Sequence, residues 1–283
     1  MDELRMVTRQ DIEECFLKDQ HRISDLETVK PIFRDQNIKT DVNTGYSSLN
    51  ELLDRFRPGE LIVIHMQPSV VKTAFIMGIT HTALLNGKTI AFFSLELCRR
   101  QVIAWMLCSG ARAAIQKCKE KSLSDDLSKR FTKSMNSLCN ASLYIDDSAA
   151  ITPTQLRSKC HHLKKEQGLD MIVVDYLGLM GIEKSAESQN VGASEKCHQL
   201  KVIAMELNVP VIVCSLLHTE DNNPSKGKLQ SLALLGNDSI GKEADAVLYL
   251  RRTDISVGTV NNSIGEIIDV KQRDVCSEPM RTN

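Results

Sequence analysis

Seven short apolar runs recur along the chain and alternate with amphipathic segments of helical length. The runs occupy residues 60–66, 89–94, 142–146, 171–180, 209–215, 246–250 and 266–270. The intervening pattern predicts helices over residues 73–85, 99–109, 124–138, 152–167 and 195–207. Strands that are apolar on both sides are typical of a parallel sheet covered on both faces. The pattern therefore predicts an α/β domain with a mostly parallel sheet and helices on both faces.

The remaining segments are polar and suggest how the chain is organised. Residues 1–40 form a linker-like segment in which Ile12, Cys15 and Phe16 predict one short amphipathic helix. That apolar stripe is too small to fold alone, so we expect it to dock on a partner. Residues 41–283 form the main domain. Two stretches in it, 181–194 and 218–240, read as long loops, which in compact domains are often functional.

Composition narrows the choice of function. Lys and Arg total 35 against 36 for Asp and Glu, which excludes a generally basic nucleic-acid coat. An aromatic content of 4% argues against the stacking platforms of single-strand binders. The 9 cysteines are scattered without a close pair, which favours buried, reduced thiols over zinc or disulfides. Without an apolar leader or a membrane-length run, the expected protein is cytoplasmic and has no membrane partner.

Candidate chemistry gathers just beyond three of the apolar runs. Gln67, Pro68 and Ser69 follow the first run and lead into Val70-Val71-Lys72-Thr73 at the start of a helix. Lys-Thr in this position is the closing half of a phosphate-binding loop, in which Lys reaches phosphates and Thr binds Mg²⁺. A surface Lys-Thr that caps a helix is the alternative.

Two acidic residues strengthen the phosphate-site interpretation. Glu96 follows the second run, and Asp175 ends the apolar residues 171–174, as the metal-binding Asp of a Walker B strand does. Either acid alone could be a helix cap or a solvated strand end. All three features in this order favour an ATPase core.

Longer motifs extend from Thr44 to about Arg273. They are TGYSSLN, QPS followed by KT, FFSLE, YIDDSAAITPTQLRS, VVDYLGLM, ELNVPVIVCS, SIGKEADAVLYL and VKQR. By these motifs the chain resembles the C-terminal ATPase domain of DnaB-type replicative DNA helicases, a RecA-like P-loop NTPase. The resemblance implies ATP-driven unwinding of duplex DNA by a ring of six subunits around one strand. The family's N-terminal domain is expected to be absent.

The resemblance also implies roles for individual residues. Lys72 and Thr73 would hold phosphate and Mg²⁺, Glu96 would polarise the attacking water, and Asp175 would support the metal. Lys271 and Arg273 match the pair that reaches the neighbouring subunit's γ-phosphate. The predicted ATP-binding set is completed by Gln67, Pro68, Ser69, Val71 and Arg252, and the predicted DNA-binding set is Lys226 and Lys228. Expected partners are single-stranded DNA, a helicase loader, and either a homo-oligomeric ring or a mixed ring with a complete helicase.

The chain departs from the family at positions near the active centre. Val71 stands where the family has Gly, and a left-handed backbone there would cost roughly 1–2 kcal/mol, about tenfold in affinity. Leu216 replaces a Gln that links γ-phosphate to the DNA-binding loops, and Leu235 replaces an Arg. Trp105 also replaces an Arg, and we predict that it packs in the core.

Two functions from different classes remain open on these residues. The leading interpretation is a helicase ATPase domain with a weakened phosphate loop. The alternative is a catalytically inactive accessory subunit that binds a helicase or DNA without hydrolysing ATP. A RecA-like ATPase of another branch is disfavoured by YLGLM, ELNVPVIVCS and VKQR.

Overall fold

The structure, a computed structural model, describes residues 41–53, 55–66, 70–113, 124–182, 192–216, 239–257 and 260–272. The helix expected over 8–18 lies outside these residues. The same holds for six of the predicted site residues, namely Gln67, Pro68, Ser69, Lys226, Lys228 and Arg273.

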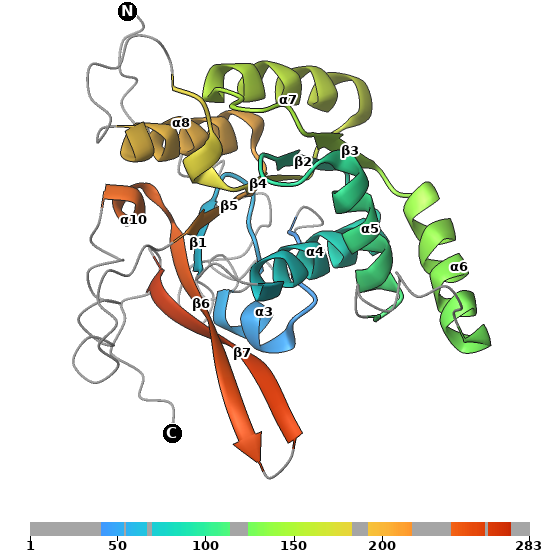
Figure 1. Ribbon diagram of the computed structural model, residues 1–283. Helices are drawn as coiled ribbons and strands as arrows, with labels where there is room; N and C mark the ends of the chain where they lie inside the picture. Colours follow the sequence, from blue (N-terminus) through green and yellow to red (C-terminus); the bar gives the residue numbers. More distant parts are fainter. Residues whose placement is uncertain are drawn as a thin grey trace, which may run out of the picture. The chain divides into compact units, whose positions relative to one another are not determined.

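Within the described residues, seven strands form one sheet (Figure 1). In spatial order they are β3 (Leu143–Asp146), β2 (Ile90–Ser94), β4 (Met171–Asp175), β5 (Val211–Leu216), β1 (Leu61–Met66), β6 (Ala246–Val257) and β7 (Val260–Gln272). The first six run parallel, and β7 pairs antiparallel with β6. Every predicted apolar run contains a strand, and the mostly parallel α/β sheet is confirmed.

Helices cover both faces of the sheet because its strands are apolar on both sides (Figure 1). Ile62 and Ile64 of β1 face a cluster built with α4 (Val70–Leu85) and α5 (Arg99–Gly110). Leu61 and Val63, the alternate residues, face the cluster of α7 (Pro153–Gln167) and α8 (Gly192–Leu207). Successive side chains of a strand point to opposite faces, so each strand joins both cores.

The helices differ from the predicted ranges mainly at their starts. α5, α7 and α6 (Asp125–Cys139) lie within a residue or so of the prediction, whereas α4 and α8 begin three residues early. Two short helices, α3 (Ser47–Leu53) and α10 (Ser239–Glu243), were not predicted. The expected loops 181–194 and 218–240 are therefore shorter, because α8 and α10 occupy their last residues.

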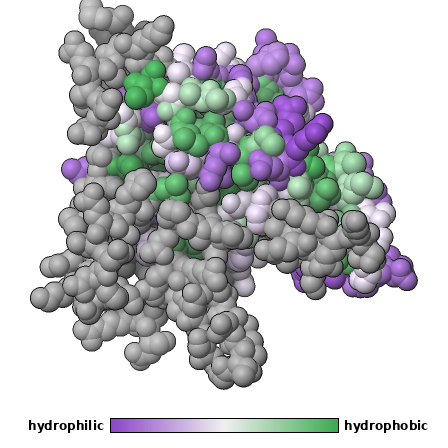
Figure 2. All heavy atoms as spheres, in the orientation of Figure 1, coloured by the Kyte–Doolittle hydropathy of each residue, from purple (hydrophilic) through white to green (hydrophobic). Residues whose placement is uncertain are grey.

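Local hydrogen bonds explain where α7 begins. Thr152 accepts from the amide of Gln155 at 3.3 Å, and the Gln155 side chain accepts from the amide of Thr152 at 3.0 Å. This reciprocal capping, followed by Pro153 in the first turn, fixes the start of the helix. Figure 2 shows that hydrophilic side chains cover the outward side of α7.

The motif TGYSSLN has a structural role beside α4. The Thr44 hydroxyl donates to the Asn50 side-chain oxygen at 2.8 Å, which shapes the turn into α3. The ring of Tyr46 lies 5.1 Å from that of Phe75 in α4. A Cβ on Gly78 would lie 2.6 Å from the Tyr46 hydroxyl, so the close approach of Tyr46 to α4 requires glycine.

The expectation of buried cysteines is only partly correct. Cys108, Cys160, Cys197 and Cys214 are buried and free, but Cys98 and Cys139 are exposed because they lie at the ends of surface helices. Trp105 is partly buried and packs against the α4–α5 core, as predicted. No helix in the described part of the chain is long and apolar enough to cross a membrane.

One carboxylate joins the amino ends of two central strands to α8. Asp245 Oδ2 accepts from the Leu61 amide at 2.8 Å and from Lys201 Nζ at 2.6 Å. The Lys201 ammonium also donates to the Gly59 carbonyl at 2.8 Å. Both side chains are less than one-fifth exposed, so water replaces these contacts poorly. The network fixes β1, which leads to the predicted phosphate loop.

We expect Asp245→Ala to lower the free energy of unfolding by about 2–3 kcal/mol, because a buried amide and a shielded ammonium lose their acceptor. Asp126→Ala is the matched control, since its carboxylate is 80% exposed and pairs with Arg130 on the same helix. Its loss should stay below about 1 kcal/mol. Urea unfolding measures both, and equal losses would contradict the assigned role of Asp245.

Candidate nucleotide site

The carboxyl ends of the parallel strands meet at one edge of the sheet. Ser94 of β2 pairs with Asp175 of β4, and Met66 of β1 pairs with Leu216 of β5. Ligands of open α/β sheets bind beyond this edge, where the order of the strands reverses. The segments that follow β1, β2 and β4 therefore converge on one region, although they are far apart in sequence.

Asp175 and Thr73 lie on the same side of the sheet. Asp175 is fully buried at the end of β4. It has the parity of Met171 and Val173, which belong to the cluster that α4 covers. Thr73 is half-buried in the first turns of α4. A carboxylate and a hydroxyl are the oxygen ligands that Mg²⁺ prefers, so this donor set fits the predicted metal.

Glu96 lies in a turn that is bound to the backbone of Asp175. The Leu95 amide donates to the Asp175 carbonyl at 2.7 Å, which carries the β2–β4 pairing past the end of the strand. The Ser94 hydroxyl donates to the Leu97 carbonyl at 2.6 Å across the turn. Glu96 itself is exposed. The two predicted catalytic acids are thus brought to neighbouring positions at the edge.

The phosphate loop differs from the sequence expectation in one respect. Val71 and Lys72 belong to the first turn of α4, which begins at Val70. An α-helix is right-handed, so the condition for the left-handed cost at Val71 is not met in this structure. The tenfold conformational penalty therefore does not apply here, and side-chain bulk is the remaining argument against phosphate binding.

Several predicted residues are placed away from this group. Lys271 pairs with Val247 in the edge strand β7, and β7 is separated from β4 by three strands. Arg252 pairs with Gly265 in the outer part of the β6–β7 ribbon. The structure does not bring either residue beside Glu96 and Asp175 within one subunit. Leu216 is half-buried at the end of β5, beside Met66.

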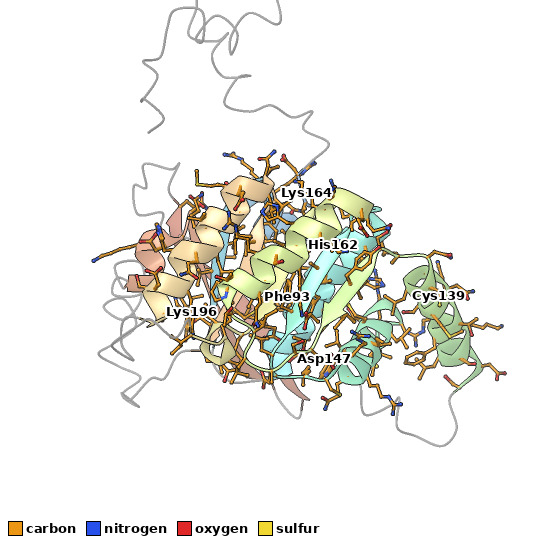
Figure 3. All side chains as sticks on the ribbon, turned by 90° about the horizontal axis from the view of Figure 1, so that it is seen from above. Phe93, Cys139, Asp147, His162, Lys164 and Lys196 are labelled. Carbon is orange, nitrogen blue, oxygen red and sulfur yellow. The ribbon has the colours of Figure 1, made fainter. Side chains whose placement is uncertain are left out.

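The segment after Asp175 is held by a buried lysine that the sequence analysis missed. Lys196, labelled in Figure 3, donates from Nζ to the Met180 carbonyl at 2.5 Å, just after the 3₁₀ helix η3 (Leu177–Leu179). Burial lowers the pKa of Lys196. The Gly181 amide donates to the Ile151 carbonyl at 3.0 Å, and a Cβ on Gly181 would lie 2.2 Å from the Ala150 carbonyl. No sequence pattern signals these contacts, because Lys196 lies on a helix of ordinary mixed composition.

A histidine joins α8 to the short helix α10. His198 Nδ1 lies 2.9 Å from Glu243 Oε2, and this hydrogen bond raises the pKa of His198. α10 begins one residue after the segment 217–238, which contains the predicted DNA-binding lysines. The contact therefore anchors one end of that segment.

Other described features do not add a second site. No group of three His, Cys, Asp or Glu residues that could hold a metal occurs among the residues that the structure describes. A groove of about 620 Å³ lies between α5, α6 and β3, away from Asp175. Apolar side chains, among them Ile103, Met135 and Tyr144, line most of it.

The sheet order, the two-faced helical cover and the acidic edge define an α/β protein with a RecA-like fold. Residues 41–280 match the family described as DnaB-like helicase C terminal domain, and the chain belongs to this family.

Relatives of known sequence agree with this assignment. The chain is 36% identical over 242 residues to the replicative DNA helicase DnaB of Geobacillus stearothermophilus, covering 83% of this chain and 52% of that protein. The replicative DNA helicase DnaC of Bacillus subtilis matches with the same identity and coverage. The chain thus spans about half the length of the curated relatives it matches.

Two solved structures share the fold. One, a phage-type or bacterial motor described simply as an ATPase domain, superposes with a TM-score of 0.73 at 24% identity, covering 90% of this chain and 93% of that one. A DnaB-like replicative helicase, solved in a study of its interactions with primase, gives a TM-score of 0.73 at 23% identity, with coverages of 94% and 65%.

The His198–Glu243 contact predicts a measurable titration. We expect the imidazole of His198 to titrate above the ordinary value of about 6.5, and Glu243→Gln to return it toward that value. The stability that the contact contributes should be complete below pH ~6.5 and be lost as pH rises through the raised folded-state pKa. NMR of the imidazole signals measures both. His81 is the internal control, because burial lowers its pKa and Glu243→Gln should leave it unchanged.

Proposed function

We propose that this chain is the ATP-hydrolysing motor domain of a ring-forming replicative DNA helicase. The observation that carries the proposal is the 2.7 Å hydrogen bond from the Leu95 amide to the Asp175 carbonyl. It holds Glu96 and Asp175 at neighbouring positions on the edge of the sheet where α4 begins with Lys72 and Thr73. Membership of the DnaB-like C-terminal domain family supports the same function.

The residues at this edge divide the work of phosphoryl transfer to water. Bound ATP with Mg²⁺ supplies the γ-phosphoryl group whose transfer to water releases the energy for movement along DNA. Lys72 holds the outer phosphates beside the amino end of α4, where backbone amides also favour negative charge. Thr73 and Asp175 hold the metal through a hydroxyl and a carboxylate. Glu96 accepts a proton from the attacking water and orients it.

The proposed partners follow from residues that cannot act within one subunit. Lys271 lies on the far edge strand from Asp175, so with Arg273 it acts on the nucleotide of a neighbouring subunit in a ring. Arg252 contacts nucleotide from the same ribbon. Lys226 and Lys228 bind the phosphates of single-stranded DNA, with a modest salt dependence because few charges take part. The ring contains copies of this chain or includes a complete helicase, and a loader places it on DNA.

A second candidate function is that of an accessory subunit without ATP turnover. Two observations favour it: Val71 occupies the first turn of α4, and Leu216 ends β5 beside Met66. A valine side chain adds bulk where phosphates need open backbone, and leucine cannot form a hydrogen bond to phosphate. Such a subunit would keep the ring surfaces and the fold while contributing no energy of its own.

Nucleotide titration and steady-state hydrolysis, each with and without Mg²⁺ and single-stranded DNA, test the enzyme against the accessory subunit. Lys72→Ala and Asp175→Asn should weaken Mg²⁺–ATP binding by about ten- to a hundredfold, the value of one or two charge-assisted hydrogen bonds. Glu96→Gln should bind as the parent does and lose hydrolysis. Glu166→Gln, which changes an exposed carboxylate on α7, is the control and should alter neither. Binding that survives Lys72→Ala unchanged would refute the proposed phosphate site.

Two substitutions at Val71 separate bulk from backbone conformation. Val71→Ala keeps a Cβ and suits a right-handed helix, whereas Val71→Gly also permits left-handed backbone. Since Val71 is helical, we expect both variants to raise ATP affinity to within about threefold of one another. A gain of about tenfold confined to Val71→Gly would mean that bound nucleotide requires a left-handed residue here.

The same variants separate binding from coupling to DNA. Val71→Gly alone should not produce unwinding, because Leu216 and Leu235 still cannot sense phosphate. Stimulation of hydrolysis by DNA should require Leu216→Gln and Leu235→Arg as well. Robust unwinding by the single variant would contradict this coupling argument. If the triple variant still binds no nucleotide, the accessory subunit becomes the better function.

A further inference from the structure

A serine hydroxyl closes the turn that carries Glu96. Ser94 is 2% exposed and occupies the last position of β2. Its Oγ donates to the Leu97 carbonyl at 2.6 Å. The bond spans three residues, so it joins the residues on either side of Leu95 and Glu96. The sequence analysis assigned no role to Ser94, although it lies inside the FFSLE motif.

Both flanks of this turn are fixed to neighbouring strands. On one side, the Leu95 amide donates to the Asp175 carbonyl at the end of β4. On the other, the Arg99 amide donates to Asp147 Oδ2 at 2.8 Å, just after β3. The Arg99 guanidinium also donates to the Ile145 carbonyl at 2.9 Å. Figure 3 labels Asp147 beside this part of the molecule.

Between these two fixed flanks, the Ser94 hydroxyl sets the curvature of the turn. The direction of the Glu96 Cα–Cβ bond depends on that curvature. A carboxylate that orients a water molecule must be held to about 0.5 Å, and a misplacement of about 1 Å can slow a reaction about a hundredfold. A small change in this turn therefore affects hydrolysis more than binding, because Glu96 holds neither phosphate nor metal.

We propose that Ser94 is a positioning residue that aims Glu96 at the attacking water through its hydrogen bond to the Leu97 carbonyl. The inference rests on the proposed function of Glu96. Ser94 touches no substrate in this scheme, and its effect passes through the backbone of the turn. Loss of the hydroxyl leaves the strand pairing of β2 intact, so the fold should persist.

Three variants test the proposal in the full chain. Ser94→Ala removes the hydroxyl, and Ser94→Thr retains it. Ser134→Ala is the matched control, because Ser134 is 4% exposed and donates to the Leu107 carbonyl at 3.0 Å between α6 and α5. ATP affinity, the single-turnover rate of hydrolysis and the urea unfolding midpoint are measured for each.

We expect Ser94→Ala to slow hydrolysis by about ten- to a hundredfold while ATP affinity stays within about twofold of the parent. Ser94→Thr should restore the rate to within about threefold. Ser134→Ala should shift the unfolding midpoint by a similar amount to Ser94→Ala without slowing hydrolysis. Hydrolysis by Ser94→Ala within about twofold of the parent, or equal slowing by Ser134→Ala, overturns the proposal.

A structural readout keeps this test separate from the proposed function. If the parent hydrolyses ATP no faster than Glu96→Gln, the proposed function fails, and amide hydrogen exchange of the peptide over residues 93–99 then decides the role of Ser94. The amides of Leu95 and Arg99 are hydrogen-bonded and should exchange slowly. Ser94→Ala should speed exchange of this peptide by about tenfold or more, and Ser134→Ala should not. Unchanged protection in Ser94→Ala overturns the positioning role.

Discussion

Parallel pairing of six strands is the constraint on which the rest of the structure depends. Parallel strands bring all their carboxyl ends to one edge, and each crossover must pass over a face of the sheet. The crossover helices bury both faces, so β1, β2, β4 and β5 contribute alternate residues to two separate cores. A stable apolar sheet and a convergent polar edge are therefore two consequences of the same pairing.

The polar edge gains its geometry from backbone contacts. The Asp175 carbonyl accepts from Leu95, so the end of β4 and the turn after β2 form one rigid unit. The turn is closed by Ser94 and held on its other flank by Asp147. Lys196 fixes the segment that leaves β4 in the opposite direction. Side chains that would act on a phosphate are thus supported by neighbours that need not touch it.

The departures from the family affect different parts of this arrangement. Val71 changes the space beside the phosphates, but its helical backbone carries no left-handed strain. Leu216 removes a hydrogen-bonding group at the end of β5 and leaves the strand pairing intact. Neither change disturbs the Glu96–Asp175 unit. The fold and the acidic edge can persist whether or not the domain completes an ATP cycle, since packing and catalysis depend on different residues.

By itself, the sequence determined the elements whose causes are local or periodic. Apolar runs predicted the strands, and Thr152 with Gln155 marks the start of α7 because capping involves residues three apart. Asp175 could be placed at a strand end because it follows four apolar residues. Only the tertiary structure decided the strand order, the length of the β6–β7 ribbon and the neighbours of Ser94, Lys196 and Asp245. Those contacts join residues distant in sequence or across a turn, and a hydrogen bond of this kind leaves no periodic trace in either partner.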